Sequence, residues 1–325
     1  MRIFSAPWFT LRRRFDRRIR TYGIAAVLVS LAAAGAQAQT CTVSMTTVAF
    51  GTVNVLPGTA VNTTATITVT CSGGSGNQRV CVSIGCGSAC DSTSRQMSGP
   101  SGAMARYDLY SNSARTTLWG SWHTGYDSAG VQMTVSHNSS ATHTVYARFL
   151  AAQPTDVAGA YTATFAADPF ITYVNASGAP ACPTGTLSAS GTTSATATVS
   201  SNCTVSSTAV SFGAQGVLNA NIDAQGTLSV QCTSQLPYAV SLNGGNSGAT
   251  DPTQRKMTRT TTSITYGLYR DAARSLPWGS TAGVNTASGT GSGTTQTLTV
   301  YGRVPPQTTP KANTYTDSII ATVTY

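Results

Sequence analysis

The sequence predicts an all-β protein made of two antiparallel, immunoglobulin-like β-sandwich domains. Three observations lead to this prediction. A series of short motifs occurs twice in the same order, apolar residues alternate with polar ones in short runs, and the composition is rich in Thr, Ser, Gly, Ala and Val with no glutamate. Such a composition disfavours long helices and favours short strands joined by polar turns.

The chain begins with a predicted signal peptide at residues 1–38. An Arg-rich start leads into the apolar run from Ile24 to Ala34, and Ala36-Gln-Ala38 follows as a small-x-small cleavage signal. The apolar run is too short to span a bilayer. Arg12-Arg-Arg-Phe15 also fits a twin-arginine signal loosely, so both export routes stay open. We therefore expect export to the periplasm.

Removing the signal peptide changes the charge of the protein. The whole chain carries 19 Lys and Arg against 10 acidic residues, a formal net charge of +9. The signal peptide holds seven of the basic residues and one aspartate, which leaves 12 basic and nine acidic residues and a net charge of +3. The basic character belongs largely to the targeting segment, and we expect no nucleic-acid partner.

The internal repeat is an ordered set of matches whose offset drifts slowly from 162 to 154. Such a drift indicates one shared framework with small loop insertions, and each copy has the size of a small domain. The matches are Cys41-Thr-Val-Ser with Cys203-Thr-Val-Ser, Phe50-Gly with Phe212-Gly, Cys71 with Cys232, Tyr107-Asp-Leu-Tyr with Tyr266-Gly-Leu-Tyr, Arg115 with Arg274, Trp119-Gly-Ser with Trp278-Gly-Ser, Val145-Tyr-Ala-Arg with Val300-Tyr-Gly-Arg, and Tyr161-Thr with Tyr315-Thr.

Within each copy the apolar residues follow the period of a half-buried strand. Clear cases are the run from Ala65 to Cys71 in the first copy and the run from Ile319 to Tyr325 in the second. Clusters of Gly, Asn, Ser and Pro separate these runs, and no helical apolar stripe is present. This pattern predicts about seven short strands in each sandwich. We place the first domain at residues 39–176, a linker at 177–202 and the second domain at 203–325.

The repeated motifs carry a family resemblance. Cys-x-Val near the start, Phe-Gly, a strand ending in Cys, Tyr-x-Leu-Tyr, Trp-Gly, Val-Tyr-Gly-Arg and a final Tyr-Thr-Asp before Thr-Val-Thr-Tyr together resemble the spore coat protein U domain. Subunits of archaic, Csu-type chaperone–usher pili are built from that domain. The second copy is the closer match. The first departs from the pattern in its last strand, from Tyr161 to Asp168, and in three additional cysteines.

This resemblance implies an assembly mechanism. Pilin domains of the family are sandwiches that lack their last strand, which a neighbouring subunit supplies after a periplasmic chaperone has occupied the groove. An outer-membrane usher is the further partner. An uncovered groove exposes apolar core and unpaired backbone, which invites aggregation. A two-domain subunit of this family is similar to the tip adhesin, whereas shaft subunits have one domain.

The ends of the chain favour the same interpretation. The sequence stops at Tyr325 on an alternating strand, so the second domain is expected to need a donor for its last strand, with Ile319, Ala321, Val323 and Tyr325 at the groove. Only two residues precede Cys41 after the cleavage site, and about ten are needed to cover a groove at ~3.3 Å per residue. A subunit that accepts a strand but donates none is expected at the tip.

The linker leaves two possibilities open. It contains the alternating segment Ala195-x-Ala197-x-Val199, at the place where a shaft subunit would carry its donor strand. This segment either completes the first domain in cis or forms the first strand of the second domain.

All eight cysteines follow the cleavage site, as expected for an oxidising compartment. The matched spans predict the disulfides Cys41–Cys71 and Cys203–Cys232, each worth about 3–4 kcal/mol in the chain-entropy model. The remaining Cys81, Cys86, Cys90 and Cys182 could form two more bonds. Cys86–Cys90 would close a short loop, and Cys81–Cys182 would pin the linker to the first domain. A metal site at Cys81, Cys86 and Cys90 is disfavoured, because the spacing is not a usual zinc pattern.

Residues private to the first copy are candidates for surface contact. Trp119 and Trp278 recur at matched positions and are expected in the cores. Trp122 has no counterpart, and together with Leu56, Val131 and Met133 it lies in turn-rich surroundings that could form exposed loops. In the family that the chain resembles, the tip adhesin binds apolar surfaces through hydrophobic loops. Ordinary partial burial is the alternative for each of these residues.

The sequence contains few residues in patterns that indicate catalysis. Without glutamate, a paired-carboxylate site would need two of nine aspartates, and none falls in a recognisable constellation. The three histidines accompany no nucleophile elbow and no metal motif. We expect no enzyme activity and no cofactor. The leading hypothesis is a pilus tip subunit for attachment to abiotic or host surfaces and for biofilm formation, at the surface of a Gram-negative bacterium. The alternatives are a lectin-like tip that binds a host glycan, and a structural coat or adaptor subunit without a receptor.

Overall fold

A computed structural model describes residues 40–122, 126, 130–166, 170–175 and 187–325. The expected signal peptide at residues 1–38 lies outside the described residues. The described part is built from strands, with one short 3-10 turn, η1 (Pro100–Gly102), and the all-β prediction is confirmed. None of the described residues form a helix that could cross a membrane.

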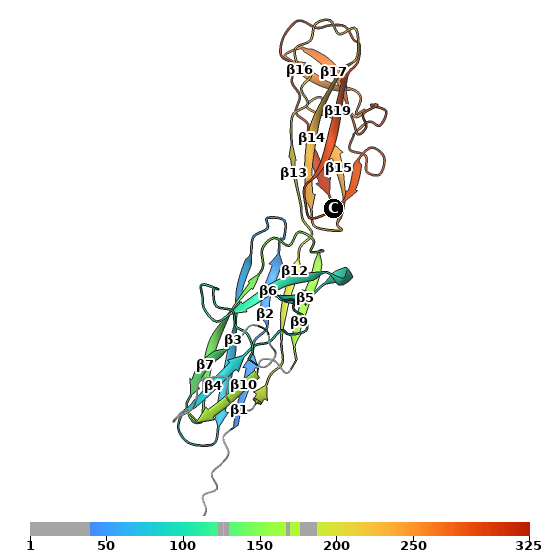
Figure 1. The fold of residues 1–325 in the computed structure, drawn as a ribbon. Coiled ribbons are helices and arrows are strands. Elements are labelled where there is room, and N and C mark those ends of the chain that lie inside the picture. Colours follow the sequence, from blue (N-terminus) through green and yellow to red (C-terminus); the bar gives the residue numbers. More distant parts are fainter. Residues whose placement is uncertain (1–39, 123–125, 127–129, 167–169, 176–186) are drawn as a thin grey trace, which may run out of the picture. The chain divides into compact units, whose positions relative to one another are not determined.

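The first domain is built from two sheets (Figure 1). The longer one has the strand order β1-β3-β8-β6-β5-β9-β12-β2, and the shorter one has the order β11-β10-β4-β7. The strands are β1 (Thr40–Met45), β2 (Val48–Val53), β3 (Val61–Ser72), β4 (Gln78–Ser83), β5 (Arg95–Ser98), β6 (Met104–Tyr110), β7 (Val131–Val135), β8 (Ser139–Phe149), β9 (Gly159–Phe165), β10 (Phe170–Asn175), β11 (Leu187–Ser190) and β12 (Thr193–Val199).

The second domain has a smaller set of strands. One sheet has the order β13-β14-β19-β17-β16 and the other has the order β18-β15-β20. The strands are β13 (Cys203–Ser207), β14 (Ile222–Cys232), β15 (Pro237–Leu242), β16 (Arg255–Arg259), β17 (Thr262–Tyr269), β18 (Ala287–Thr290), β19 (Gln296–Val304) and β20 (Ala321–Thr324).

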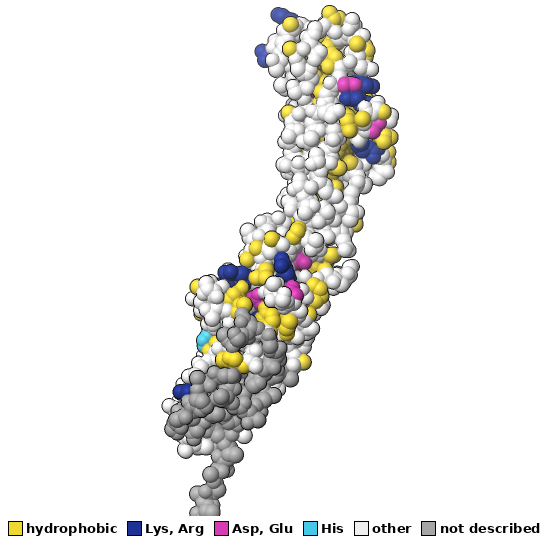
Figure 2. Space-filling model, in the orientation of Figure 1, with side chains coloured by type: hydrophobic (Ala, Val, Ile, Leu, Met, Phe, Trp, Pro, Cys, Tyr) yellow, Lys and Arg dark blue, Asp and Glu magenta, His cyan; other side chains and the backbone are white. Residues whose placement is uncertain are grey.

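The alternation seen in the sequence determines which side of each strand enters the core. In β3 the buried residues are every second one from Ala65 to Cys71, and in β14 they include Leu228, Val230 and Cys232. Successive side chains of a strand point to opposite faces, so one face of each strand packs inward and the other carries Thr, Ser and Asn to water. Few charged side chains are visible on either domain in Figure 2, in keeping with the composition.

The two domains share their framework strand by strand. Cys41 pairs with Cys71 across β1 and β3, and Cys203 pairs with Cys232 across β13 and β14. The indole N–H of Trp119 donates to Val82 O at 3.0 Å, and that of Trp278 donates to Val240 O at 2.9 Å. Both indoles are buried, as predicted for residues that recur in the repeat. By this correspondence β13 to β20 take the places of β1, β3, β4, β5, β6, β7, β8 and β10.

Disulfide bonds cross-link both domains. Bonds join Cys41 to Cys71, Cys203 to Cys232, and Cys86 to Cys90. Cys81 is also disulfide-bonded, while Cys182, its predicted partner, lies outside the described residues. No described cysteine is free.

The described part of the predicted linker, residues 187–202, contains strands that pair with the first domain. Strand β12, within the range 177–202 that the sequence assigned to a linker, pairs antiparallel with β9 along its whole length and parallel with β2. Its side chains Ala195, Ala197 and Val199 are at most 4% exposed and belong to the core of the first domain. The first domain therefore extends to Val199, because this stretch buries its apolar face there.

Candidate functional site

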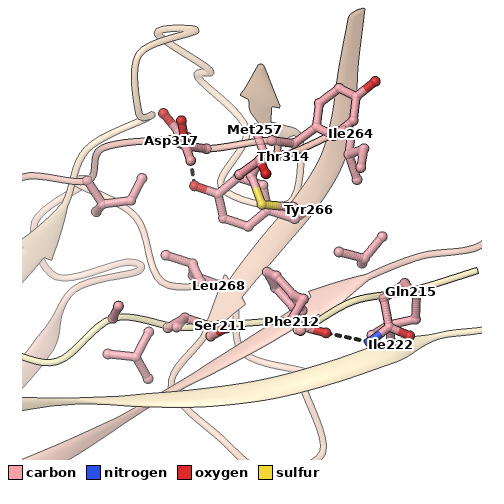
Figure 3. Close-up of a pocket in the computed structure, with 18 of the residues that line it drawn as sticks. Ser211, Phe212, Gln215, Ile222, Met257, Ile264, Tyr266, Leu268, Thr314 and Asp317 are labelled. Carbon is pink, nitrogen blue, oxygen red and sulfur yellow. Dashed lines mark hydrogen bonds between the residues drawn. The ribbon is translucent and has the colours of Figure 1, made fainter. Parts of the chain in front are cut away.

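A groove of about 1260 Å³ runs along the second domain. Its floor consists of apolar side chains from β14, β16, β17 and β19, and its rims are the segments 205–216 and 309–319 (Figure 3). Prominent in the floor are Ile222, Leu228, Met257, Ile264, Tyr266, Leu268, Val300 and Val304, and Phe212 lines the groove from the rim. Apolar side chains gathered in an open groove are unusual on a folded domain, and such surfaces are commonly interaction sites.

Three strands of the first domain have no counterpart at this groove. Segment 210–216 aligns with β2 and segment 313–319 aligns with β9, yet neither is a strand in the fully described range 203–325. Their places are still recognisable, because Thr258 bridges to Thr316 as Ser98 pairs with Thr162 in the first domain. No strand of the second domain takes the place of β12.

The missing strands change the burial of matched side chains. Val48, Phe50 and Met97 are buried in the first domain, at 6% exposure or less. Their counterparts Val210, Phe212 and Met257 are only half-buried. The same residue types at the same framework positions thus differ in burial according to whether a strand covers them. Leaving them uncovered forfeits roughly 25 cal/mol for each Å² of apolar surface.

In the first domain β12 is the strand that provides this cover. Ala195 lies opposite Ala163 of β9 and next to Val48 of β2, and Val199 lies opposite Gly159 and next to Val53. Its neighbours β9 and β2 both gain a full hydrogen-bonding partner, so backbone groups that would be orphaned at the rims of the sheet are paired. The counterparts of those groups in the second domain line the open groove.

The four residues predicted at the groove lie along the rim or next to it. Ile319 and Ala321 line the groove and are half-buried. Val323 pairs with Val240 within β20 and packs on the core, and Tyr325 is 55% exposed beyond the end of β20. Two of the four residues thus line this groove, and the assignment of the groove to a donor strand stays a prediction.

One acidic residue lies among the apolar lining. Asp317 accepts hydrogen bonds at Oδ1 from the amides of Asn246 (2.7 Å) and Ser318 (2.8 Å), and at Oδ2 from the Tyr266 hydroxyl (2.7 Å; Figure 3). Burial and this carboxylate raise the pKa of Tyr266 well above its ordinary value, so the phenol remains a donor. The first domain has Ala163 at the position of Asp317.

The residues predicted for surface contact divide into two groups. Trp122 is half-buried and lies over Gly130, where an added Cβ would collide with the indole ring. Leu56, in the turn after β2, and Val131, at the start of β7, are half-buried. Met133 is 7% exposed, faces the core from β7 and pairs with Val80. The expectation of an exposed loop is wrong for Met133, because it belongs to the inward face of a regular strand.

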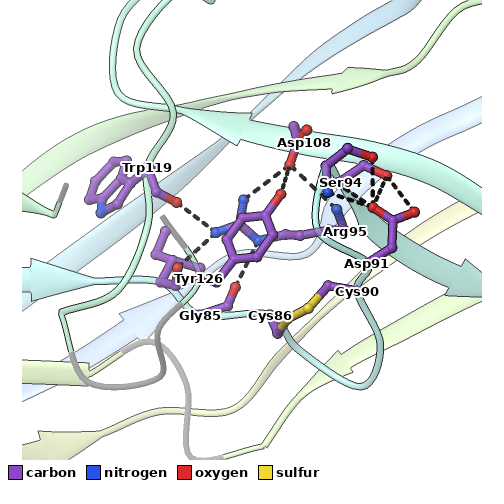
Figure 4. Close-up of polar contacts among 11 residues, drawn as sticks. Gly85, Cys86, Cys90, Asp91, Ser94, Arg95, Asp108, Trp119 and Tyr126 are labelled. Atoms are coloured by element: carbon purple, nitrogen blue, oxygen red, sulfur yellow. Dashed lines mark hydrogen bonds and ion pairs between the residues drawn. A yellow bond between two sulfur atoms is a disulfide. The ribbon is translucent and has the colours of Figure 1, made fainter. Parts of the chain in front are cut away.

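A polar cluster includes Tyr126, four residues after Trp122 in the sequence (Figure 4). The Tyr126 hydroxyl donates to Asp108 Oδ1 at 2.5 Å, and the Arg95 guanidinium lies 4.3 Å from the centre of the Tyr126 ring. Burial raises the pKa of Asp108, while the bond from Tyr126 and the charge of Arg95 oppose that rise. The second domain has Gly267 in place of Asp108, so this anchor is private to the first domain.

Sequence reasoning missed the arginine at the centre of each domain. Arg95 is fully buried and donates to the carbonyls of Ile84 (2.7 Å), Gly85 (2.7 Å) and Trp119 (2.6 Å). Arg255 donates in the same way to Leu242, Asn243 and Trp278. The repeated Arg-x-Met, at Arg95 and Arg255, was the signal that could have identified them.

Among the residues that the structure describes, no three His, Cys, Asp or Glu side chains gather as a metal site. His137 and His143 lie against backbone carbonyls, and the His143 ring packs edge-on against Trp119. His123 lies outside the described residues.

The comparison with protein families decides the assignment. The model of the Spore Coat Protein U domain matches residues 26–168 and again residues 189–322. The chain belongs to the spore coat protein U family. This confirms the resemblance inferred from the repeated motifs. Protein U of Myxococcus xanthus is a relative that is 32% identical over 114 residues, which cover 33% of this chain and 63% of that protein. The chain thus spans less than two thirds of that curated relative.

Two solved structures are similar to this chain in fold. A chain in the crystal structure of the CsuC–CsuE chaperone–tip adhesion subunit pre-assembly complex, from the archaic chaperone–usher Csu pili of Acinetobacter baumannii, is similar with a TM-score of 0.51 and 17% identity. The match covers 88% of this spore coat U protein and all of that chain. The CupB6 tip adhesin of Pseudomonas aeruginosa matches with a TM-score of 0.37 and 10% identity over 82% of this chain and 87% of its own, too remote to carry an argument. The likeness to the Csu structure supports the immunoglobulin-like class of the sandwich.

Proposed function

We propose that this protein is the two-domain tip subunit of a chaperone–usher pilus, assembled by donor-strand complementation. The observation that carries the proposal is the difference between the two domains. The chain's own β12 fills the groove of the first domain, and the matching groove of the second domain is open. A periplasmic chaperone would cover the open groove first, and the N-terminal extension of the next subunit would then replace it at the usher.

The proposal for the tip rests on the same difference. A first domain that is completed in cis offers no groove to a further subunit, so growth of the fibre would proceed from the second domain alone. Export to the periplasm and display on the surface of a Gram-negative cell belong to the proposal. So does a non-enzymatic role in attachment to surfaces and in biofilm formation, with the loop that carries Trp122 as the contact.

The experiment that tests assembly is self-complementation. A donor-like alternating strand is fused after Tyr325 through a flexible linker with as many residues as separate β10 from β12 in the first domain. We expect a soluble monomer whose second domain unfolds cooperatively, because the strand buries the groove and pairs its rims. The matched control carries aspartate at every inward position of the same strand and is expected to aggregate or to bind the chaperone. A native second domain that is monomeric and cooperatively folded without a partner contradicts the proposal.

The family name itself favours one alternative, a structural coat or adaptor subunit without a receptor. Adhesion assays separate this alternative, and the lectin-like alternative, from the proposal. Cells that display the fibre should bind bare polystyrene if the tip contacts apolar surfaces. Inhibition by a soluble sugar would instead indicate a glycan receptor, and fibres that bind neither would indicate a structural role.

A further inference from the structure

We propose that the second-domain groove selects its donor strand through Asp317 and Ile319, and that it rejects a strand with the face of β12. The preferred donor presents a hydrogen-bonding side chain opposite Asp317 and a large apolar one opposite Ile319. This inference rests on the proposed function, since it names the chemistry of the strand that the groove would accept.

The register of the first domain shows which donor residue meets which groove residue. In the β12–β9 pair, Thr193 lies opposite Phe165, Ala195 opposite Ala163, and Ala197 opposite Tyr161. Residues opposite each other in an antiparallel pair point to the same face, with their Cβ atoms about 4.5–5.5 Å apart. The residues that β9 directs at its partner therefore set the chemistry of that partner.

The second domain keeps one of these three residues and changes two. Tyr161-Thr-Ala-Thr-Phe165 of the first domain corresponds to Tyr315-Thr-Asp-Ser-Ile319. The tyrosine stays, a carboxylate replaces the methyl group of Ala163, and Ile319 replaces the ring of Phe165. Both changed residues line the groove.

The carboxylate changes what an incoming strand must offer. An ionised carboxylate has about four acceptor positions, and Asp317 fills three of them with the amides of Asn246 and Ser318 and the hydroxyl of Tyr266. One position stays on Oδ2. A strand that covers the groove removes water from this position, and a buried acceptor without a partner is costly. Ser, Thr, Asn or Lys opposite Asp317 would supply the donor, whereas the alanine of β12 would not.

The change from Phe165 to Ile319 acts on shape. Phe165 is fully buried in the first domain and lies opposite the small Thr193. Ile319 occupies less volume, so a donor with Thr opposite it would leave a void in a core that is otherwise closely packed. Leu, Ile or Phe at this donor position restores the lost volume. The two grooves of one chain thus call for different strands, which prevents β12 of one copy from occupying the second domain of another.

The test uses the full mature chain with donors fused after Tyr325. One donor has the β12 sequence, Thr-Ser-Ala-Thr-Ala-Thr-Val, one carries Ser for the first Ala, one carries Leu for the first Thr, and one carries both changes. In the native background we expect each change to raise the folding constant of the second domain about tenfold over the β12 sequence. In Asp317→Ala the Ser donor should lose its advantage while the Leu donor keeps it. Ser318→Ala, on the opposite face, is the matched control and should leave both preferences unchanged.

The outcomes separate the inference from the proposed function. If no donor yields a folded second domain, the groove is not a strand acceptor and the proposed function fails. If every donor folds it equally well, or if the Ser advantage persists in Asp317→Ala, the proposed function stands and this inference is overturned.

A reciprocal test in the first domain does not depend on the folding of Asp317 variants. Ala163→Asp should lower the folding constant of the first domain at least tenfold, and adding Ala195→Ser should recover about tenfold of the loss. Ala195→Ser alone should give no gain. An absence of recovery in the double variant would equally overturn the inference.

Discussion

At the scale of single residues, the cores are held by arginines that act as hydrogen-bonding hubs. The guanidinium is planar and has five N–H donors, so one buried side chain can satisfy several backbone carbonyls at once. Arg95 does this for three carbonyls in the first domain, and Arg255 repeats the arrangement in the second. An arginine in the centre of a sandwich is costly without such partners, so its recurrence marks a framework position.

The first prediction concerns Arg95. Arg95→Met should destabilise the first domain by about 3 to 5 kcal/mol, because it leaves three buried carbonyls without donors at about 1–3 kcal/mol each. Arg95→Lys should recover only part of the loss, since a lysine cannot reach three carbonyls in one plane. Arg148→Met, at a partly exposed arginine that bonds Asn62, is the control and should cost less than about 1 kcal/mol. Urea denaturation followed by tryptophan fluorescence in a Trp278→Phe background measures each change, and equal losses for Arg95 and Arg148 would contradict the hub role.

The second prediction concerns the pH dependence of stability at Asp156. Burial raises the pKa of Asp156 to about 6 from an ordinary value of 3.8, and its Oδ2 has no hydrogen-bond partner among the described residues. The folded state thus holds the proton more tightly than the unfolded state. The stability contribution of Asp156 therefore falls as the pH rises from about 4 to about 6. Asp156→Asn should remove this fall and leave the domain more stable at pH 7.

Asp91 provides a control of opposite sign. Hydrogen bonds from Thr93 and Ser94 hold its pKa at about 2, so its contribution is present above about pH 4 and is lost as the pH falls toward 2. Asp91→Asn should therefore lower stability at pH 7 and leave the fall between pH 4 and 6 in place. Thermal unfolding across pH 3 to 8 distinguishes the two variants. An unchanged profile in Asp156→Asn would show that Asp156 is not the titrating group.

At the scale of elements, β12 decides whether a sandwich of this family is closed. It joins β9 to β2 and buries the three apolar residues of its inward face. The second domain has residues that match most of this core, but no strand takes the place of β12, and the segments that match β2 and β9 are not strands. One strand can complete the fold because the unpaired backbone groups and exposed apolar side chains all lie along one gap between two rims.

The third prediction tests this closure within the first domain. Ala197→Asp should strongly destabilise the first domain, by several kcal/mol, since it buries a carboxylate opposite the apolar ring of Tyr161. Thr198→Asp is the matched control, because the adjacent side chain is exposed on the outer face of the same strand. Hydrogen exchange of the β9 amides reports the loss directly. Similar protection in both variants would mean that β12 does not hold the groove closed.

At the scale of the whole molecule, the same framework of strands occurs twice, once with its groove closed and once with its groove open. The first domain is closed and carries private features, namely the loop with Trp122 and its anchor through Tyr126 and Asp108. The second domain keeps the plain framework and an open groove. This difference is the basis of our proposal that the first domain contacts a surface and the second joins the fibre.

The fourth prediction concerns attachment. Trp122→Ser should weaken binding of assembled fibres to plastic several-fold without reducing the number of fibres, because the indole belongs to a loop outside the shared framework. Trp119→Ser is the contrasting variant and should prevent folding, since Trp119 is fully buried. Tyr126→Phe, which removes the bond to Asp108, should weaken attachment by an intermediate amount. Normal attachment with Trp122→Ser would exclude this loop as the contact.

The sequence by itself determined the internal repeat and the alternation of apolar and polar residues along the strands. Two copies of one β domain, the disulfide partners Cys41–Cys71 and Cys203–Cys232, and the buried tryptophans all follow from matched positions, since equivalent residues of a repeat occupy equivalent sites. Period-two alternation also located the strand from Ala195 to Val199. These are local properties, and a local pattern is enough to recognise them.

Only the tertiary structure decided which surfaces those strands cover. The alternation of β12 fits either domain, and its place beside β9 depends on pairing with residues more than a hundred positions away in β2. Met133 is buried because β7 pairs with β4, and Arg95 binds three carbonyls from two other segments of the chain. The groove is open because no strand of the second domain takes the place of β12, although the two domains have similar sequences. Strand pairing joins segments that lie apart in the sequence, and the burial of a strand depends on the strands with which it pairs.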